Sequence, residues 1–525
     1  MLSLDGSRQT GHSARSQNIN ACLTIANTIK SSFGPLGLDK ILVDEVGDVT
    51  ITNDGATILK LLNIEHPAAK VMVELAKLQE KEVGDGTTSV VLFAAELMKQ
   101  AQELIVTENM HPTIVNNGYK ISCKESIRFI NSNLVIASNN ISQDVVINAI
   151  KTSISSKIIR SESEYFSKII IDVLKTIKKT DGKIDTYPIK SVKIVKCPGK
   201  SMIDSKFING VAIYSGTAAQ TCIKSVNNAK IALFDFSIAR HKMKINVSIV
   251  VNDPKKLEAI RKREFDITLE KVTKIISSSV NVIACGRGVG DEYMKYFTES
   301  NIMVLRRVNK SDLKRLSKTT GATLVTSITT LEGSDSFDSS YLGYAESVVL
   351  EQMCDEEIII FNNPKFKSAA SIILRGPNYM ALDEIQRAIE DGMYVVKRAL
   401  ESKKLVCGGG SVEVACSIHL ENFAKSIKTK EQLAIIAFSK SLLVIPKQLS
   451  LNAGIDSLDL VCQLRAFHFY AQINGDRWEL YKYYGLDLND GDISDNHKAG
   501  ILEPYMSKNK MLKLSTEAAI TILRV

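Results

Sequence analysis

Residues 83–89 read Val-Gly-Asp-Gly-Thr-Thr-Ser, and this stretch joins a tight turn to the start of a long amphipathic helix. Two glycines around an aspartate allow the backbone to approach a ligand closely. The hydroxyl residues Thr87, Thr88 and Ser89 then open the helix, whose first N–H groups and positive dipole end suit a phosphate. Asp85 is a candidate Mg²⁺ ligand, because Mg²⁺ usually takes one or two protein carboxylates together with phosphate oxygens. An ordinary glycine turn before a helix is the alternative.

Three other stretches could meet the same ligand. Residues 34–37, Gly-Pro-Leu-Gly, follow a predicted helix and could supply a second backbone loop. Residues 53–57, Asn-Asp-Gly-Ala-Thr, predict either a hairpin turn or a helix start. Residues 407–411, Cys-Gly-Gly-Gly-Ser, place three glycines directly before a predicted helix, which indicates close approach by a ligand or by neighbouring backbone. Asp391 lies in another predicted helix, where spacing alone gives no reason to prefer it to Glu390.

The hydrophobic pattern divides the chain into a helical front, a mixed middle and a helical back. Helices are predicted over 19–29, 68–78 and 90–105, from Pro254 to about Ile276 with Asp253 as N-cap, and from Ala381 to about Tyr470. Short β-branched runs predict strands at 192–196, 229–235, 245–251, 281–285, 302–308 and 357–361, and further short strands near the end, the last at 519–525. This order predicts a discontinuous domain built from both ends, with the centre inserted between them.

Composition narrows the class of protein. The chain has 525 residues, 45% of them apolar, which suits about three domains. The nine cysteines are scattered singly, which indicates a reducing compartment and argues against a disulfide framework or a structural zinc site. No apolar run approaches the ~18 residues of a membrane span, and the polar first 17 residues predict no secretory signal. The net charge of +8 is spread among acidic residues, so we expect no nucleic-acid partner, no membrane partner and a cytoplasmic location.

Two further motifs resemble nucleotide-binding loops only superficially. Residues 199–201, Gly-Lys-Ser, lack the earlier glycine of a P-loop, since position 194 is Ile194. Residues 286–290, Gly-Arg-Gly-Val-Gly, follow an apolar strand and precede Arg306 and Arg307 by about 20 residues, as an NADP-binding unit would have it. Their spacing is G-x-G-x-G rather than G-x-G-x-x-G, and the sequence predicts no βαβ unit before them. An NADP-dependent oxidoreductase is therefore the third hypothesis.

The motifs together are far more specific than any one of them. They occur in the order Lys30-Ser-Ser-Phe-Gly-Pro-Leu-Gly-Leu-Asp-Lys40, Thr52-Asn-Asp-Gly-Ala-Thr-Ile58, Glu65-His-Pro-Ala-Ala-Lys70, Gly84-Asp-Gly-Thr-Thr88, Ser155-Ser-Lys157, Gly408-Gly-Gly410, Gly485-Leu-Asp487 and Thr516-Glu-Ala-Ala-Ile-Thr-Ile-Leu523. From end to end the chain resembles the group II chaperonins, in particular the eukaryotic cytosolic complex CCT, also called TRiC. The stretches 38–44, 47–51, 443–446 and 464–468 resemble one subunit type of that complex most.

The resemblance implies a multidomain α and α/β fold, the group II chaperonin fold. A mostly helical equatorial ATPase domain would comprise 1–137 and 392–525. A small intermediate domain would comprise 138–204 and 359–391. An α/β apical domain that binds substrate would comprise 205–358, with a helical protrusion near 240–276 that serves as a built-in lid.

Site residues follow from the resemblance position by position. It implies that ATP and Mg²⁺ are the cofactors and that Asp85 is the metal ligand. Asp391 would orient the attacking water, with Asp54 as its equatorial helper. The residues implied to contact the nucleotide are Gly34, Gly55, Gly86, Thr87, Thr88, Ser89, Ser156, Lys157 and Gly409. Two positions depart from the family pattern: Cys407 replaces a common proline, and Lys498 lies near a position where relatives often direct Glu or Gln toward the nucleotide.

The resemblance also implies partners and a function. Seven paralogous subunits would join this chain in a hetero-oligomeric double ring of sixteen, which uses ATP to enclose and fold non-native cytosolic proteins such as actin and tubulin. Prefoldin-type co-chaperones are further expected partners. The main alternative is a chaperonin-like interaction protein that has lost hydrolysis, and the presence of Asp54, Asp85 and Asp391 argues against it.

Overall fold

A computed structural model describes the chain in two compact units, Met1–Ile170 with Asp383–Val525 (unit 1) and Ile171–Leu382 (unit 2). Both ends of the chain therefore belong to unit 1. The residues that the structure describes are 11–137, 142–181, 184–240, 254–329, 337–354, 356–366, 369–473 and 475–524.

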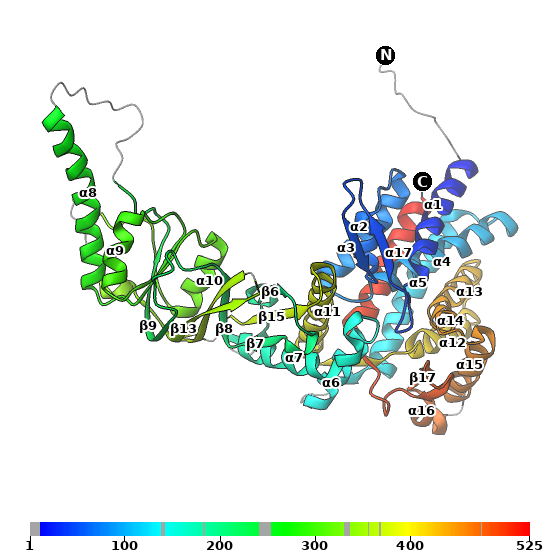
Figure 1. Ribbon diagram of the computed structural model, residues 1–525. Coiled ribbons are helices and arrows are strands. Elements are labelled where there is room, and N and C mark those ends of the chain that lie inside the picture. Colours follow the sequence, from blue (N-terminus) through cyan, green and yellow to red (C-terminus); the bar gives the residue numbers. More distant parts are fainter. Residues whose placement is uncertain are drawn as a thin grey trace, which may run out of the picture. The chain divides into compact units, whose positions relative to one another are not determined.

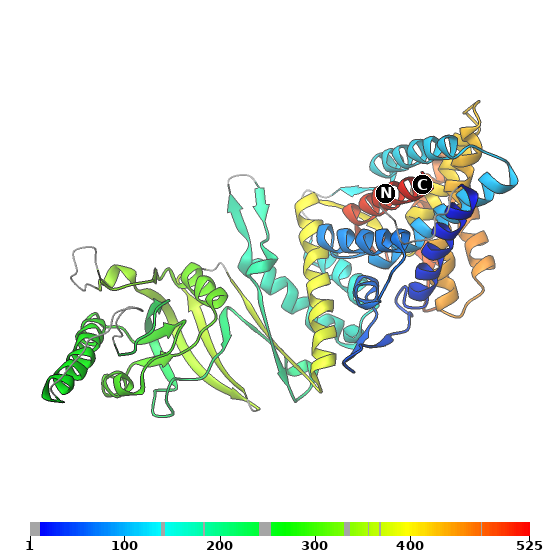
Figure 2. The same ribbon diagram turned by 90° about the horizontal axis from the view of Figure 1, so that it is seen from above.

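Unit 1 is a bundle of helices drawn from both ends of the chain. Its central helix, α4 (Thr87–Thr107), is buried along most of its length, and α17 (Tyr505–Leu523) packs directly against it. Figures 1 and 2 show these two segments side by side, blue and red. The helices that complete the bundle are α1 (His12–Lys30), α3 (Pro67–Glu82), α5 (Pro112–Phe129), α12 (Ser411–Ala424), α13 (Glu431–Leu442), α14 (Val444–Asn452) and α15 (Ser457–Ile473).

Short strands hold the chain ends of unit 1 to its middle. In a three-stranded sheet of order β19-β16-β3, β16 (Lys404–Cys407) lies between β19 (Leu502–Pro504) and β3 (Ile136–Ala137). Both pairings are antiparallel. Because β16 leads directly into the triple-glycine turn and α12, this sheet fixes where that turn lies. A separate two-stranded sheet is the antiparallel hairpin of β1 (Lys40–Val43) and β2 (Val49–Thr52), which leads into α2 (Gly55–Leu61).

Unit 2 is built on a seven-stranded mixed sheet of order β11-β10-β9-β13-β14-β8, with β12 also pairing with β9. Strands β9, β10, β11 and β12 are parallel, whereas β13, β14 and β8 are antiparallel to their neighbours. The bounds are β8 (Gly210–Tyr214), β9 (Ser225–Phe234), β10 (Val282–Cys285), β11 (Met303–Leu305), β12 (Leu324–Val325), β13 (Gly343–Met353) and β14 (Glu356–Pro364). A smaller sheet of order β6-β15-β7 joins β6 (Lys193–Pro198), β15 (Ser371–Gly376) and β7 (Lys206–Ile208).

Successive side chains of a strand point to opposite faces of the sheet, and apolar residues on both faces explain why helices cover both sides of the large sheet. On one face, Phe234 and Cys285 pack with α8 (Pro254–Ser277) and α9 (Asp291–Glu299). On the other face, Leu233 and Ala284 pack with α10 (Lys310–Thr320). Successive side chains of β9 and β10 are therefore buried on opposite sides, so these strands read as continuous apolar runs.

The chain end differs from the strand that we predicted there. Residues 519–523 belong to α17, and the predicted strand at 519–525 is wrong. A short apolar run cannot by itself distinguish a strand from a buried helix, and α17 is buried on several sides, as Ala519, Ile520, Ile522 and Leu523 show. The predicted strand at 245–251 and the N-cap Asp253 lie outside the described residues.

One stretch, Glu431–Asn452, is long and apolar enough by composition to cross a membrane, although we expected none. It spans α13 and α14, and 67% of its most apolar window is buried inside the protein. Phe438 and Ile445 belong to the main core of unit 1. The apolar character of this stretch is thus explained by packing between helices.

The core of unit 1 offers a direct test of this packing. Phe438 contacts Phe93 and Tyr119 edge to face, with ring centroids 5.4 and 5.7 Å apart. Replacing a fully buried phenylalanine by alanine removes apolar burial and leaves a cavity, so Phe438→Ala should lower the free energy of unfolding by about 3–5 kcal/mol. Urea denaturation measures this. The matched control, Phe469→Ala, alters a ring that is 44% exposed on α15 and should change stability by less than about 1 kcal/mol. Equal losses in the two variants would contradict the packing described here.

Candidate functional site

The turn before α4 has a backbone that requires its two glycines. Gly84 and Gly86 both have left-handed φ angles, 87° and 76°. A Cβ atom on Gly84 would lie 2.3 Å from the Cβ of Tyr394, so another residue is excluded by contact as well as by conformation. No side chain of the described chain caps the start of α4, whose N-cap is Gly86. The first N–H groups of α4 can therefore donate hydrogen bonds to a bound ligand.

These N–H groups face a cavity of about 390 Å³ that lies within unit 1. Its walls come from segments far apart in the sequence: the loop after α1, the start of α4, the turn after α6 (Gln143–Ile154), α11 (Tyr379–Ser402), the triple-glycine turn and the segment from β17 (Tyr484–Asp487) to β19. The lining includes the following residues proposed from the sequence: Gly34, Asp54, Asp85, Gly86, Thr87, Thr88, Ser89, Ser156, Lys157, Asp391 and Gly409.

Gly55 is the one proposed contact residue that does not line the cavity. It begins α2, and a Cβ there would lie 2.5 Å from the Oγ1 of Thr88. Gly55 therefore allows α2 to approach the first turn of α4. The sequence left a hairpin or a helix start open for residues 53–57, and the structure shows a helix start.

Asp54 is the N-cap of α2 and also reaches α4. Its carboxylate accepts hydrogen bonds from the N–H of Ala56 at 3.3 Å, the N–H of Thr57 at 3.0 Å and the hydroxyl of Thr57 at 2.7 Å. The hydroxyl of Thr87 donates to it at 3.1 Å. Burial opposes the charged form, but the Lys157 charge and the donors of Thr57 and Ala56 together hold the pKa of Asp54 below its ordinary value. Asp54 is therefore an ionised carboxylate at neutral pH.

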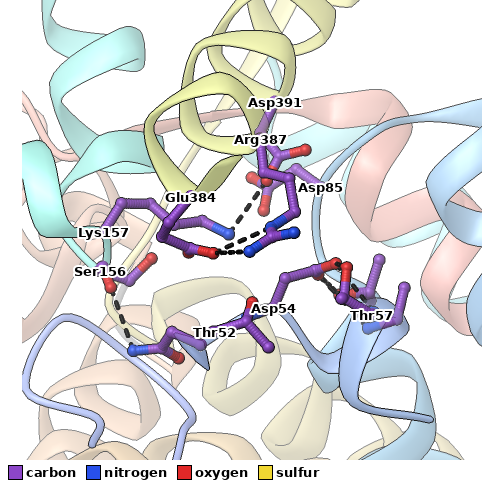
Figure 3. Close-up of polar contacts among 12 residues, drawn as sticks. Thr52, Asp54, Thr57, Asp85, Ser156, Lys157, Glu384, Arg387 and Asp391 are labelled. Atoms are coloured by element: carbon purple, nitrogen blue, oxygen red, sulfur yellow. Dashed lines mark hydrogen bonds and ion pairs between the residues drawn. The ribbon is translucent and has the colours of Figure 1, made fainter. Parts of the chain in front are cut away.

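Lys157 and Asp391 form a buried ion pair at the cavity wall. The Nζ of Lys157 lies 3.1 Å from Oδ2 of Asp391, and the lysine side chain is 9% exposed. Figure 3 shows the ammonium pointing up to Asp391 from the turn that carries Ser156. Burial raises the pKa of Asp391 well above its ordinary value, with Asp54 and Asp85 adding to the rise, although Lys157 opposes it. Burial would lower the pKa of Lys157, but Asp391, Asp54 and Glu384 raise it instead.

Asp85 differs from Asp54 in having few donors. Its Oδ1 accepts from the N–H of Gly86 at 2.7 Å. Burial raises the pKa of Asp85, and the charges of Lys157 and Lys508 only partly offset that rise. A carboxylate in this position has charge that a cation could balance. In the described part of the chain, His, Cys, Asp and Glu side chains form no group of three or more that could hold a metal ion. A divalent cation at Asp85 would therefore also need oxygen atoms from a bound molecule such as a phosphate.

Sequence reasoning missed two buried ionic groups beside the cavity. Lys508 of α17 lies 2.7 Å from Glu413 of α12 and 2.8 Å from Glu503, which lines the cavity. Glu384 and Arg387 of α11 form an ion pair at 2.7 Å. Neither group has a local sequence signal, because each depends on pairing between segments or on the inward face of a helix.

The glycine turn before α12 meets the β17 wall. The N–H of Leu486 donates to the carbonyl of Gly409 at 3.0 Å, and the amide of Asn496 donates to the carbonyl of Gly408 at 2.9 Å. A Cβ on Gly409, whose φ is 65°, would lie 2.3 Å from the Nδ2 of Asn496. The turn thus serves both alternatives that the sequence left open, since Gly409 borders the cavity and also contacts a neighbouring strand. Lys498 is not among the cavity-lining residues, and its side chain is 84% exposed.

The loop at 286–290 does follow a parallel βαβ unit, contrary to our expectation. Strands β9 and β10 are parallel, and α8 lies between them in the sequence. However, the first turn of α9 contains Asp291 and Glu292, and two carboxylates at a helix N-terminus repel a pyrophosphate. The loop therefore lacks the electrostatics of a dinucleotide site.

Known proteins are similar to this chain over nearly its whole length. The model of the TCP-1/cpn60 chaperonin family matches residues 25–525. The chain belongs to that family. T-complex protein 1 subunit alpha of Schistosoma mansoni is 49% identical, over 100% of this chain and 96% of that protein, and the Arabidopsis thaliana protein of the same name is 47% identical, over 99% and 96%. Thermosome subunit beta of Methanothermobacter thermautotrophicus is 37% identical, over 99% and 92%.

Three predictions are thereby confirmed. The chain is a group II chaperonin subunit with the multidomain fold of that family, and the subunit type that residues 38–44 and 464–468 indicated is the alpha subunit. The alternative of an NADP oxidoreductase is not supported by any of these relatives.

A buried histidine behind the β17 wall makes the chaperonin's stability sensitive to pH. The Nε2 of His468 lies 2.9 Å from the carbonyl oxygen of Tyr484 in β17 (Tyr484–Asp487). Burial lowers the pKa of His468 from 6.5 to about 4. The unfolded chain therefore takes up this proton at a higher pH than the folded chain. The stability that neutral His468 contributes is present above pH 6.5 and is lost as the pH falls toward 4.

We therefore expect acidification from pH 7 to pH 5 to destabilise the unsubstituted chain by about 2 kcal/mol more than His468→Gln, whose amide can still donate to Tyr484. Urea denaturation at the two pH values measures the difference. The same pH dependence in both chains would show that His468 is not buried in neutral form.

Proposed function

We propose that this chaperonin subunit binds ATP with Mg²⁺ in the cavity of unit 1 and hydrolyses it. The observation that carries the proposal is that one cavity brings together the uncapped start of α4, the carboxylates of Asp54, Asp85 and Asp391, and the buried Lys157. Phosphoryl transfer requires positioning and charge neutralisation rather than covalent chemistry by the protein. This cavity supplies both.

The phosphates would lie against the start of α4. The N–H groups of residues 87–89 and the hydroxyls of Thr88 and Ser89 are the donors available there, because the N–H of Gly86 donates to Asp85 and the hydroxyl of Thr87 donates to Asp54. Gly34 brings a second loop to the cavity. Its φ is 87°, a backbone conformation that residues with a side chain do not adopt readily. Gly409 would border the nucleoside end, next to the β17 wall.

Asp85 would hold the Mg²⁺. Its buried carboxylate with a raised pKa and few hydrogen-bond donors fits a cation that also takes phosphate oxygens. When bound, Mg²⁺ would supply neutralisation of the charge that develops on the transferring phosphate. The protein's own contribution is to keep this carboxylate close to the start of α4.

Asp391 and Asp54 would act on the attacking water. Asp54, already ionised and held by four donors, would fix the orientation of the water from the side of α2. Asp391 has a raised pKa and therefore a higher basicity, which suits a carboxylate that accepts a proton from the water as it attacks. Ser156 and Lys157, on the turn after α6, would respond to the phosphate that leaves.

Coupling to protein folding would follow from where Asp391 lies. We propose the three-domain division given above, with 1–137 and 392–525 equatorial, 138–204 and 359–391 intermediate, and 205–358 apical. Lys157 and Asp391 then belong to the intermediate domain, and Asp54 and Asp85 belong to the equatorial domain. A site completed by two domains hydrolyses ATP only when those domains close, which links hydrolysis to enclosure of a client.

The assembly and its partners are part of the same proposal. Relatives named T-complex protein 1 subunits support a ring of paralogous subunits. We propose a cytoplasmic double ring of sixteen with seven paralogues, non-native clients such as actin and tubulin, and prefoldin-type co-chaperones. A hydrolysis-deficient interaction protein is the remaining alternative, and it predicts that ATP binds without being cleaved.

Replacing the proposed water-orienting carboxylate tests hydrolysis directly. In the assembled complex, 8-azido-ATP labelled at either the α or the γ phosphate is photo-crosslinked, and denaturing separation of the subunits then gives the label on this subunit alone. The α label measures binding, and loss of the γ label measures hydrolysis. Asp391→Asn should retain binding and slow the loss of γ label roughly 100-fold or more, because general-base assistance contributes about 10²–10⁴-fold.

The matched control is Asp459→Asn on α15, which alters an exposed aspartate outside the cavity lining and should hydrolyse ATP at the unsubstituted rate. Hydrolysis by Asp391→Asn at the unsubstituted rate would refute the assigned role. Retention of γ label by the unsubstituted subunit would favour the hydrolysis-deficient alternative.

A further inference from the structure

Lys157 lies between two carboxylates of the same helix. Glu384 and Asp391 are seven residues apart on α11, so nearly two helical turns place them on one face. Figure 3 shows the two side chains on either side of the Lys157 ammonium, with Asp391 above and Glu384 below. Of the two, only Asp391 is close enough for an ion pair, at 3.1 Å. Burial would lower the pKa of Lys157, and the charge of Glu384 helps the two aspartates Asp391 and Asp54 to raise it.

Glu384 is held in place but has a free oxygen. Its Oε2 accepts from Nε of Arg387 at 2.9 Å and lies 2.7 Å from the Nη2 of the same guanidinium. Arg387 in turn donates to the carbonyl of Ile51 in β2, at 3.3 Å. The residue is 3% exposed, and among the described residues its Oε1 is buried without a hydrogen-bond partner. A buried carboxylate oxygen without a donor is unfavourable, so the position favours the arrival of a cation.

The proposed hydrolysis step gives Lys157 a reason to move. While the ammonium lies 3.1 Å from the Oδ2 of Asp391, its charge lowers the basicity of the carboxylate that is to accept a proton from the attacking water. A lysine in this cavity wall cannot simply be left unpaired, because an uncompensated buried charge is strongly unfavourable. Its long flexible stem allows the ammonium to change partner without movement of the backbone.

We propose that Glu384 is a positioning residue for hydrolysis, whose free Oε1 receives the Lys157 ammonium when Asp391 engages the attacking water. This inference rests on the proposed function and deepens it. Glu384 does not touch the nucleotide in this account. It acts through Lys157 by making the release of Asp391 favourable, and its ion pair with Arg387 keeps it in position.

The test combines Glu384→Gln with Lys157→Met in the assembled complex, using the two-label crosslinking of this subunit. Gln keeps an oxygen for Arg387 but loses the charge that attracts Lys157. We expect Glu384→Gln to slow the loss of γ label about 10-fold or more, while the ATP concentration for half-maximal α labelling changes less than about 3-fold. Glu384→Asp, which keeps the charge, should hydrolyse within about 3-fold of the unsubstituted subunit.

The double variant separates a positioning role from a structural one. In the Lys157→Met chain no ammonium needs a second partner, so adding Glu384→Gln should change the rate less than about 2-fold. A decrease of the same size in both backgrounds, or a parallel loss of binding and hydrolysis, would overturn the inference. So would a Glu384→Gln rate equal to that of the control Glu401→Gln, which removes a carboxylate from the far end of α11.

Failure of the proposed function has a different signature. If the unsubstituted subunit retains its γ label, or if Asp391→Asn loses it at the normal rate, then the hydrolysis mechanism is wrong and the inference falls with it. If both of those behave as expected and Glu384→Gln hydrolyses normally, only the role of Glu384 is refuted.

Discussion

The site depends on the electrostatic interaction of the Lys157 ammonium with the surrounding aspartates. Asp54, Asp85 and Asp391 border the same cavity, and without a cation nearby their charges would repel one another and disfavour ionisation. Lys157 lowers the pKa of Asp54 and limits the rise at Asp85 and Asp391. The result is a set of carboxylates with different protonation tendencies in one place, which is what a site needs if one carboxylate is to bind a metal and another is to activate water.

The fold supplies the geometry that this lysine requires. The lysine comes from the turn after α6, Asp391 comes from α11, and Asp54 and Asp85 come from the starts of α2 and α4. Close approach between these elements depends on glycines at the points of contact. Gly84 lies against Tyr394 of α11, and Gly55 lies against Thr88 of α4, and in each case a Cβ atom would overlap its neighbour. Packing and chemistry are therefore specified by the same short motifs.

Local motifs could be predicted from the sequence because their physics is local. The turn at 83–89 and the triple glycine before α12 were both expected to allow close approach, and both border the cavity. Spacing could not distinguish Asp391 from Glu390, and here the resemblance to chaperonins supplied the choice. The group II fold and the alpha subunit type were likewise predicted from the ordered motifs and confirmed by the family match.

The missed features depend on contacts between distant segments. Glu384, Glu413 and Lys508 look like ordinary charges on amphipathic helices, and their burial becomes evident only when α11, α12 and α17 are packed. The strand expected at 519–525 failed for a related reason, since an apolar run reveals burial but not the element that is buried. The βαβ unit before residue 286 was missed although its two strands and its helix were predicted, because the parallel pairing of β9 with β10 is a contact between distant segments.

A high-resolution structure of the assembled complex with Mg²⁺, ADP and a trigonal or tetrahedral phosphate mimic would test the central claim most directly. We expect the mimic against the N–H groups of residues 87–89, a metal ion on Asp85, and a water between the mimic and Asp391. We also expect that the Lys157 ammonium has left Asp391. A nucleotide outside this cavity, or Lys157 still paired with Asp391 beside a bound mimic, would contradict it.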